Sequence, residues 1–303
     1  MHTGGIIVKK IKIICNPNSG RQAVQKNIPG LVEILEENNY HIDVYTTKMQ
    51  LDAMYVASRA CKDKYDIIVA VGGDGTVNEV VNGVMPNKTR PKLAVYPAGT
   101  VNDFANYLKV PRTMKEFAEI IIKEKTTKID VGLGGDRYFL NVAAAGLLTD
   151  VAYRVSSEAK TVLGKFAYYL GGLRELPRQM FKPIKITLKI GDVEEKREIL
   201  FFLVANTPSV GGFKYVAPEA DISDGKFDLL IVEKSQFIDV ASIFFMALTG
   251  NHTSHPNLQY IQVDAFSVYC DDNIYVDLDG EQGGKLPMDF KVKKDAIDLI
   301  VPD

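Results

Sequence analysis

An apolar strand that ends in glycine constrains the fold of this chain more than any other feature. Residues 67–71 read Ile-Ile-Val-Ala-Val, a continuous apolar run that is typical of a strand buried on both faces. A polar, glycine-rich loop follows directly: Gly72, Gly73, Asp74, Gly75 and Thr76. Glycine lets the backbone adopt unusual dihedral angles and lets a ligand approach closely. A plain strand-to-helix turn is the alternative, but three glycines with an aspartate and a threonine exceed what a turn needs. The loop therefore predicts a phosphate site built from backbone N–H groups.

The first 130 residues alternate between strand and helix patterns. Strands are predicted at residues 11–15, 42–45, 67–71 and 93–96, and helices at 28–38, 53–60, 76–84 and 113–124. This order predicts a parallel sheet with helices on both faces. Ligands of such sheets bind beyond the carboxyl ends of the strands, where Asn16, Thr46, Gly72 and Ala98 fall.

The second half of the chain changes to an antiparallel pattern. Residues 182–190 alternate apolar and polar side chains, and further strands are predicted at 197–205, 227–232, 258–263, 266–270 and 274–278. One helix is predicted at 237–248, and Gly132–Asp136 is interpreted as a hairpin turn. The sequence thus predicts an α/β domain over residues 1–130 and a β-sandwich domain over 131–290. Residues 291–303 could return to either domain.

Composition excludes several classes of protein. Lys+Arg 36 against Asp+Glu 38 gives a net charge of −2, without the basic excess of a nucleic-acid-binding protein. The three cysteines are far apart and form no CxxC pair, which argues against a disulfide framework or a zinc site and fits the reducing cytosol. No signal peptide is evident at the N-terminus. The strongest apolar run, Ile199–Ala205, is too short to cross a membrane.

Two further loops follow predicted strands of the first half. The first is Asn16-Pro17-Asn18-Ser19-Gly20-Arg21, whose composition suits either a phosphate loop or an ordinary turn. The second is Pro97-Ala98-Gly99-Thr100-Val101-Asn102-Asp103-Phe104. Thr100 or Asn102 could simply cap the next helix, or Thr100 could contact a nucleotide while Asp103 adds charge to the same site as Asp74. The chain contains neither a GxGxxG nor a GxxxxGK[ST] motif, which argues against a dinucleotide fold and a P-loop kinase.

Together, residues 72–83, 16–21 and 97–105 resemble the diacylglycerol kinase catalytic-domain family, and most of all its soluble bacterial lipid kinases. NAD kinases share the Gly-Gly-Asp-Gly-Thr core more distantly. The resemblance implies an active site between an α/β nucleotide domain and a β-sandwich domain. It also implies that ATP is held by Asn16, Pro17, Asn18, Ser19, Gly20, Thr47, Gly72, Gly73, Asp74, Gly75, Thr76, Val77, Asn78 and Thr100. Asp74, Asp103 and Asp130 are implied to form a charged network around the nucleotide and its Mg²⁺.

Two short segments of the second half extend this resemblance. Asp279-Gly280-Glu281 matches the family's Asp-Gly-Glu element, in which the glutamate is proposed as general base. The catalytic residues implied are therefore Glu281, Asp74 and Asp279. Residues 217–226 match a loop that holds a structural Mg²⁺, with Asp224 as side-chain ligand and Asp221 and Lys226 offering backbone carbonyls. Without the resemblance, both segments would also fit ordinary turns.

We expect an ATP-dependent lipid kinase that phosphorylates diacylglycerol or a related lipid. The alternatives are a kinase for a soluble acceptor such as NAD, and a non-catalytic regulator that binds nucleotide or lipid. Cations mixed with aromatic residues over 160–182 suit an anionic membrane surface, although a solvated basic loop would read the same way. The expected location is the cytoplasm, with transient contact at the inner face of the membrane and a possible homodimer.

Overall fold

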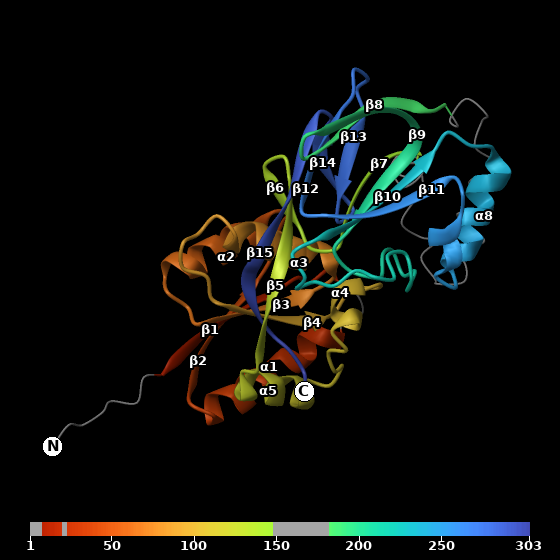
Figure 1. The fold of residues 1–303 in the computed structure, drawn as a ribbon. Helices are drawn as coiled ribbons and strands as arrows, with labels where there is room; N and C mark the ends of the chain where they lie inside the picture. Colours follow the sequence, from red (N-terminus) through yellow and green to blue (C-terminus); the bar gives the residue numbers. More distant parts are fainter. Residues whose placement is uncertain (1–7, 20–22, 148–181) are drawn as a thin grey trace. The chain divides into compact units, whose positions relative to one another are not determined.

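The chain divides into two compact units, each of which is described by itself. Unit 1 comprises residues 1–129 and 295–303, and unit 2 comprises residues 130–294. The structure is a computed structural model that describes residues 8–19, 23–147 and 182–303 (Figure 1). The basic and aromatic segment expected to meet a membrane lies outside the described residues, except for Lys182.

Unit 1 alternates strands and helices, as predicted. Its elements are β1 (Lys9–Cys15), α1 (Ala23–Glu37), β2 (Tyr40–Thr46), α2 (Asp52–Lys62), β3 (Ile67–Gly72), α3 (Asp74–Val84), β4 (Lys92–Pro97), α4 (Asp103–Tyr107) and α5 (Met114–Lys123). The strand β1 pairs in parallel with both β2 and β3, and β3 pairs in parallel with β4. The last strand, β15 (Met288–Ile300), joins this sheet through the parallel pairing of Leu299 with Leu93.

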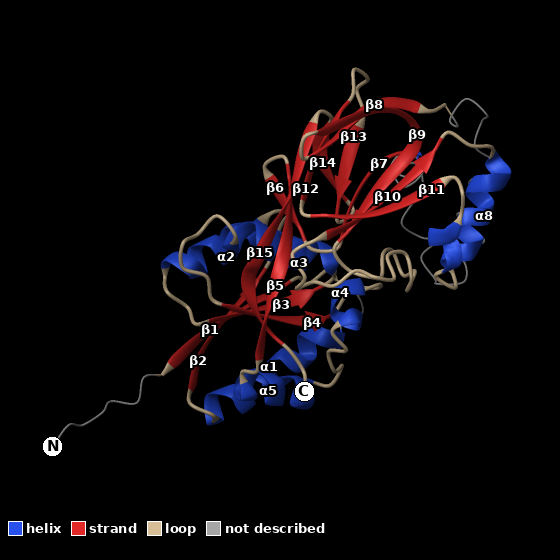
Figure 2. Cartoon of the chain, in the orientation of Figure 1, coloured by secondary structure: helices blue, strands red, loops and turns tan. Residues whose placement is uncertain are grey.

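Helices cover both faces of this sheet, which explains the continuous apolar runs of its strands (Figure 2). On one face, α1 and α5 pack against each other and against alternate strand residues such as Ile13 and Val69. On the other face, α2 packs against α3. All six residues of β3 are buried, so the glycine loop follows the most protected strand of the unit.

Unit 2 is an antiparallel β structure. Its elements are β5 (Thr126–Gly134), which begins in unit 1, β6 (Arg137–Phe139), β7 (Val142–Gly146), β8 (Ile184–Ile190), β9 (Val193–Ala205), β10 (Phe227–Glu233), α8 (Phe237–Ala247), the 3₁₀ helix η2 (Asn251–Ser254), β11 (Leu258–Val263), β12 (Ala265–Tyr269), β13 (Tyr275–Leu278) and β14 (Glu281–Lys285). The long strand β9 pairs with β7, β8 and β10, and β10 also pairs with β11.

The apolar run Ile199–Ala205 in β9 is buried on both faces. Phe202 and Val204 belong to the core between the strands, while Phe201 and Leu203 belong to a second core beneath α8. This double burial explains why the run is continuous, whereas β8 alternates apolar and polar residues.

The predicted fold class, an α/β unit followed by a β-sandwich-like unit, is confirmed. The sequence patterns missed the short strands β7 and β14, and β9 begins four residues earlier than expected. Gly132 and Gly134 lie in β5, so the β5–β6 hairpin turns only at Gly135 and Asp136. No helix in the described ranges is long and apolar enough to cross a membrane.

Candidate active site

Three loops of unit 1 leave the same edge of its sheet because backbone hydrogen bonds continue the strand pairing past the strand ends. Asn16 N–H donates to Val71 O at 3.0 Å, and Ala98 N–H donates to Gly72 O at 2.9 Å. Thr47 N–H donates to Cys15 O, also at 2.9 Å. The three predicted loop segments and Thr47 are therefore brought together at the carboxyl ends of β1 to β4.

Glycines are required where these loops touch. A Cβ on Gly99 would lie 2.5 Å from the Gly73 Cα, a distance that real Cβ atoms do not show. A Cβ on Gly72 would collide with Thr76. The glycines therefore let two loop backbones meet and let Thr76 sit directly over the end of β3. At Gly75 nothing lies within 4 Å of the Cβ position, so this glycine faces open space.

The amino end of α3 has general features that suit an anion. Its N-cap residue is Gly73, so no side chain caps the first turn. The exposed N–H groups and the helix dipole place partial positive charge there, which suits phosphate oxygens. Asn16 Nδ2 donates to Thr76 Oγ1 at 3.0 Å and thereby fixes the β1 loop to this turn. Val77 and Asn78, also predicted to bind nucleotide, are buried in α3.

Two carboxylates flank this turn. Asp74 is half-buried, and Phe104 N–H donates to its Oδ1 at 3.4 Å. Burial raises the pKa of the Asp74 carboxyl, while backbone N–H groups of Phe104, Asp103 and Asn102 partly oppose that rise. Asp103 is 8% exposed and begins α4. A bound cation would offset the burial cost of both carboxylates, so this part of the site fits Mg²⁺ together with phosphate.

The loop after β1 is held by its own polar groups. Asn16 Oδ1 accepts from Asn18 N–H at 2.9 Å, and Ser19 Oγ donates to Asn16 O at 2.7 Å. Pro17 lies within this turn, and the predicted phosphate ligand Gly20 lies outside the described residues.

Asn102 shapes the third loop, a role that the sequence patterns missed. Its side chain accepts from Gly99 N–H and donates to Gly99 O, both at 2.7 Å. It occupies the N-cap position of α4 with a left-handed backbone but makes no capping hydrogen bond. These two hydrogen bonds hold Gly99 next to Gly73. The neighbouring Thr100, predicted to contact the nucleotide, is exposed. The only feature of the sequence that could have indicated the contact between Asn102 and Gly99 is an asparagine three residues after a glycine.

In unit 2, both oxygens of the Asp279 carboxylate accept hydrogen bonds from backbone N–H groups. Its Oδ2 accepts from Leu140 N–H at 2.7 Å, and its Oδ1 accepts from Asn141 and Val142 N–H at 2.8 and 2.9 Å. Asp277 Oδ1 accepts from Gly280 N–H at 2.7 Å. These bonds fix the turn between β13 and β14. Asp279 therefore has the environment of a positioning residue for this turn rather than of a proton acceptor.

Glu281 follows this fixed turn as the first residue of β14 and is partly exposed. Its carboxylate is thus presented at the end of a strand whose register is set by the pairing of Leu278 with Glu281. Such a carboxylate can take a proton from an acceptor hydroxyl that comes within hydrogen-bond reach.

The predicted metal loop contains exposed carboxylates in tight turns. Asp221 Oδ1 accepts from Ser223 N–H at 2.9 Å, and Asp224 Oδ1 accepts from Lys226 N–H at 2.8 Å.

The fully buried Asp130 is joined to this loop, because its Oδ2 accepts from Gly225 N–H at 2.6 Å. Asp130 belongs to unit 2, whereas Asp74 and Asp103 belong to unit 1. Within the described residues, no three His, Cys, Asp or Glu side chains gather into a metal-binding group. Backbone carbonyls would therefore have to complete any cation site here.

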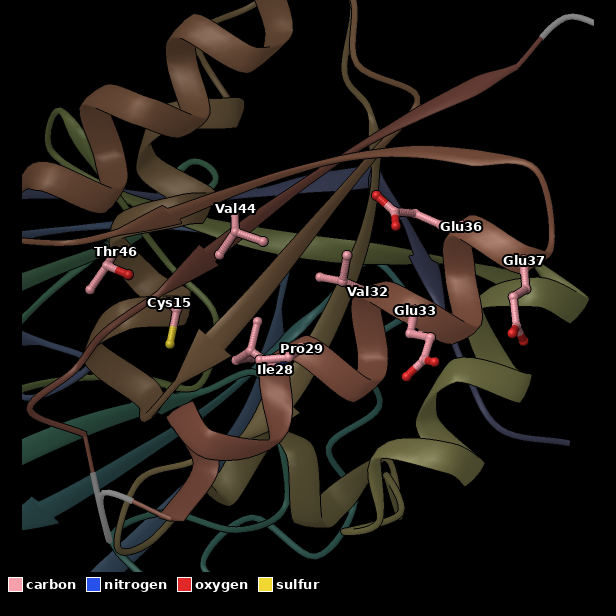
Figure 3. Close-up of a pocket in the computed structure, with 9 residues that line it drawn as sticks. All are labelled: Cys15, Ile28, Pro29, Val32, Glu33, Glu36, Glu37, Val44 and Thr46. Carbon is pink, nitrogen blue, oxygen red and sulfur yellow. The ribbon is translucent and has the colours of Figure 1, made fainter.

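A groove of about 650 Å³ lies between α1 and β2 in unit 1 (Figure 3). Ile28, Val32 and Val44 line its apolar part, while Glu33 and Glu36 stand on its rim. Cys15 and Thr46 place one end of the groove beside the loops after β1 and β2. The acidic rim of this groove disfavours phosphate.

Comparisons with known proteins agree with this reading. Residues 10–133 match the diacylglycerol kinase catalytic domain, and residues 141–301 match the YegS C-terminal NAD kinase beta sandwich-like domain. The chain is 39% identical over 295 residues to "Diacylglycerol kinase" of Staphylococcus aureus strains JH9 and Newman, covering 97% of this chain and 93% of the relative.

Solved structures show the same fold. The crystal structure of a diacylglycerol kinase from Bacillus anthracis str. Sterne is similar with a TM-score of 0.79 at 25% identity, covering 97% of each chain. A second structure from that organism gives a TM-score of 0.85 at 26% identity, over 100% of this chain and 98% of its own. The chain therefore belongs to the diacylglycerol kinase family and is a lipid kinase, a phosphotransferase for which ATP is the implied substrate.

Proposed function

We propose that this protein transfers the γ-phosphate of ATP to the hydroxyl of diacylglycerol or a related lipid. The observation that supports this most is the uncapped amino end of α3, where Gly72, Gly73 and Gly99 leave the backbone open to phosphate oxygens. Both S. aureus relatives named above are called diacylglycerol kinases, which supports the lipid acceptor.

In unit 1, the loops at 16–20 and 72–78, with Thr47 and Thr100, hold the nucleotide in this proposal. Asp74 and Asp103 would hold a Mg²⁺ ion through their carboxylate oxygens. Mg²⁺ supplies charge neutralisation for the phosphoryl group in transfer. The loop Asp221–Lys226 holds a second, structural Mg²⁺ with Asp224 as its carboxylate ligand.

Glu281 acts as general base on the lipid. The hydroxyl oxygen attacks the γ-phosphorus and forms a new P–O bond, while the bond from that phosphorus to the β–γ bridging oxygen breaks. ADP leaves with the electron pair, and the hydroxyl proton passes to Glu281. Asp279 supports this step indirectly, because its three N–H contacts fix the turn that carries Glu281. A bilayer-held acceptor also requires transient contact with the inner face of the membrane.

The decisive experiment measures transfer from labelled ATP to diacylglycerol vesicles, with NAD as a competing soluble acceptor. We expect Glu281→Gln to lower kcat by about 10²–10⁴-fold, since a general base contributes that much. Asp74→Ala should abolish transfer while the circular dichroism spectrum stays native. Glu194→Gln, an exposed β9 residue, is the matched control and should keep full activity.

Three outcomes would contradict the proposal. Full activity of the Glu281 variant would reject its role as base. Preferential labelling of NAD would make the protein a kinase for a soluble acceptor. Tight ATP binding without turnover on a total lipid extract would favour a regulator.

A further inference from the structure

One carboxylate of α3 holds the beginning of α2 in unit 1. Glu79 Oε1 accepts from Leu51 N–H at 3.0 Å, and Glu79 Oε2 accepts from Ala53 N–H at 3.1 Å. The side chain is half-buried and follows Thr76, which is tied to Asn16, by three residues. A single side chain therefore connects the helix with the predicted phosphate turn to the neighbouring helix (Figure 1).

The first turn of α2 depends on this acceptor. Its N-cap residue is Leu51, whose apolar side chain accepts no hydrogen bond. The Leu51 backbone has a φ of 66°, a left-handed conformation that is unfavourable for leucine. Glu79 accepts from the N-cap N–H and from the N–H of Ala53 in the first turn. A residue of another helix thus does what a capping box does within one helix.

Backbone contact fixes the distance between these two helices one turn further along. A Cβ on Gly83 would lie 2.1 Å from Met54 O, so α3 and α2 touch there without an intervening side chain. Gly83 follows Glu79 by four residues and lies on the same face of α3. With the helix spacing set by Gly83, the Glu79 carboxylate determines where the chain before α2 lies relative to the first turn of α3.

The chain that Glu79 holds in this way carries Thr47. Thr47 is 8% exposed, and its N–H donates to Cys15 O at 2.9 Å. Lys48 N–H donates to Asp52 Oδ2 at 2.8 Å. We call residues 47–51 the 47–51 loop. It is fixed to β1 at its first residue and to α3 at its last.

We propose that Glu79 is a positioning residue for the nucleotide. It holds the 47–51 loop so that Thr47 and the first turn of α3 can bind the same ATP molecule. This inference rests on the proposed function, which assigns a nucleotide contact to both. Glu79 uses both carboxylate oxygens on backbone N–H groups, so its effect reaches ATP only through the placement of the loop.

Glu79→Gln in the full chain tests this role. The amide keeps one acceptor oxygen, while its NH₂ group faces the second N–H and leaves it without an acceptor. We expect the Kd of a fluorescent ATP analogue and the KM for ATP to rise about tenfold, with kcat at saturating ATP within about twofold of the wild type. Hydrogen exchange should speed up at the amides of Leu51 and Ala53. Glu79→Asp, one methylene shorter, cannot reach both N–H groups and should behave alike, so it carries the test if the glutamine variant does not fold.

Glu116→Gln is the matched control for the loss of a helix cap. The Glu116 Oε2 accepts from Thr113 Oγ1 at 2.5 Å at the beginning of α5, which carries none of the predicted nucleotide contacts. This variant should lower the thermal unfolding midpoint, as Glu79→Gln does, and leave the Kd and KM for ATP unchanged.

The outcomes separate this inference from the proposed function. If the wild type binds no ATP, the proposed function fails and the positioning role fails with it. Labelling of NAD in place of diacylglycerol would change the acceptor only, since the nucleotide titration needs none. If the wild type binds ATP and both Glu79 variants lose thermal stability at unchanged Kd and KM for ATP, Glu79 is a structural cap and the positioning role is rejected. A lower kcat at unchanged KM would place Glu79 in the transfer step and would also overturn the proposal.

Discussion

Glu124 is a carboxylate that belongs to none of the candidate active-site loops, and three side chains keep it charged. Lys9 Nζ and Tyr40 Oη donate to its Oε1 at 2.6 and 2.9 Å, and Lys92 Nζ donates to its Oε2 at 2.7 Å. Burial alone would raise the pKa of Glu124, but these hydrogen bonds outweigh it and lower the pKa to about 2. The residue ends α5 with a left-handed backbone and joins that helix to β1, β2 and β4.

We expect Glu124→Gln to lower the free energy of unfolding by about 1–2 kcal/mol at neutral pH, a modest value because both lysines are partly exposed and screened. Since the folded-state pKa is depressed, the contribution is complete above the ordinary value of 4.5 and is lost as pH falls towards about 2. Urea unfolding at several pH values should show the two proteins converging in acid. Glu119→Gln, exposed on α5, is the control. A pH-independent difference would argue against the charge as its cause.

The sequence alone predicts phosphate binding by the glycine loops, because glycine and short polar side chains after a strand suit phosphate, and this stays a prediction. The contacts of Asn102, Asp279 and Glu124 could not be predicted from the sequence. Each residue acts through partners distant in sequence or through backbone groups of a turn. Asp279, for example, accepts hydrogen bonds from the backbone N–H groups of residues 140–142. The periodicity of apolar residues in a sequence does not indicate such contacts, because only the fold brings these residues together.

At the level of elements, the contact between the β3–α3 and β4–α4 loops depends on the absence of two side chains. The backbone of Gly99 is too close to Gly73 for a Cβ, and Asn102 holds it there. The β3 and β4 strands were predictable because both are buried and apolar. The short strands β7 and β14 were not, since Val-Ala-Ala-Ala-Gly and Glu-Gln-Gly-Gly-Lys show no alternation of large apolar and polar side chains.

We expect Gly99→Ala to destabilise unit 1 by about 1–3 kcal/mol, as overpacking does, and to weaken nucleotide binding because the two loops must separate. Gly30→Ala is the matched control, since nothing lies within 4 Å of the Cβ position at Gly30 in α1. Alanine there should be neutral or stabilising by up to about 1 kcal/mol. Thermal unfolding and titration with a fluorescent ATP analogue measure both effects. Equal behaviour of the two variants would show that the loops do not need this contact.

At the scale of the whole molecule, the fold class followed from the change of pattern near residue 130, where helix-strand alternation gives way to antiparallel strands. The pattern could not assign the last strand, because an apolar segment such as Ala296–Val301 fits either sheet equally well. In the structure, its final residues complete unit 1. Leu299 pairs with Leu93, Val301 N–H donates to Lys125 O at 3.0 Å, and Arg90 Nη1 donates to Ala296 O at 2.8 Å.

Removal of residues 295–303 should therefore unfold unit 1 selectively. Ile297, Leu299 and Ile300 are at most 3% exposed, and each contributes about 2 kcal/mol by burial, so their combined loss approaches the whole stability of an ordinary domain. Hydrogen exchange should show lost protection in β1, β3 and β4, while β9 and β10 remain protected. Truncation after Val301 is the control, because it removes only Pro302 and Asp303 and breaks the exposed pair between Lys123 and Asp303. Equal loss of protection in both units would mean that they unfold as one body, and intact protection in β4 would mean that the returning strand is dispensable.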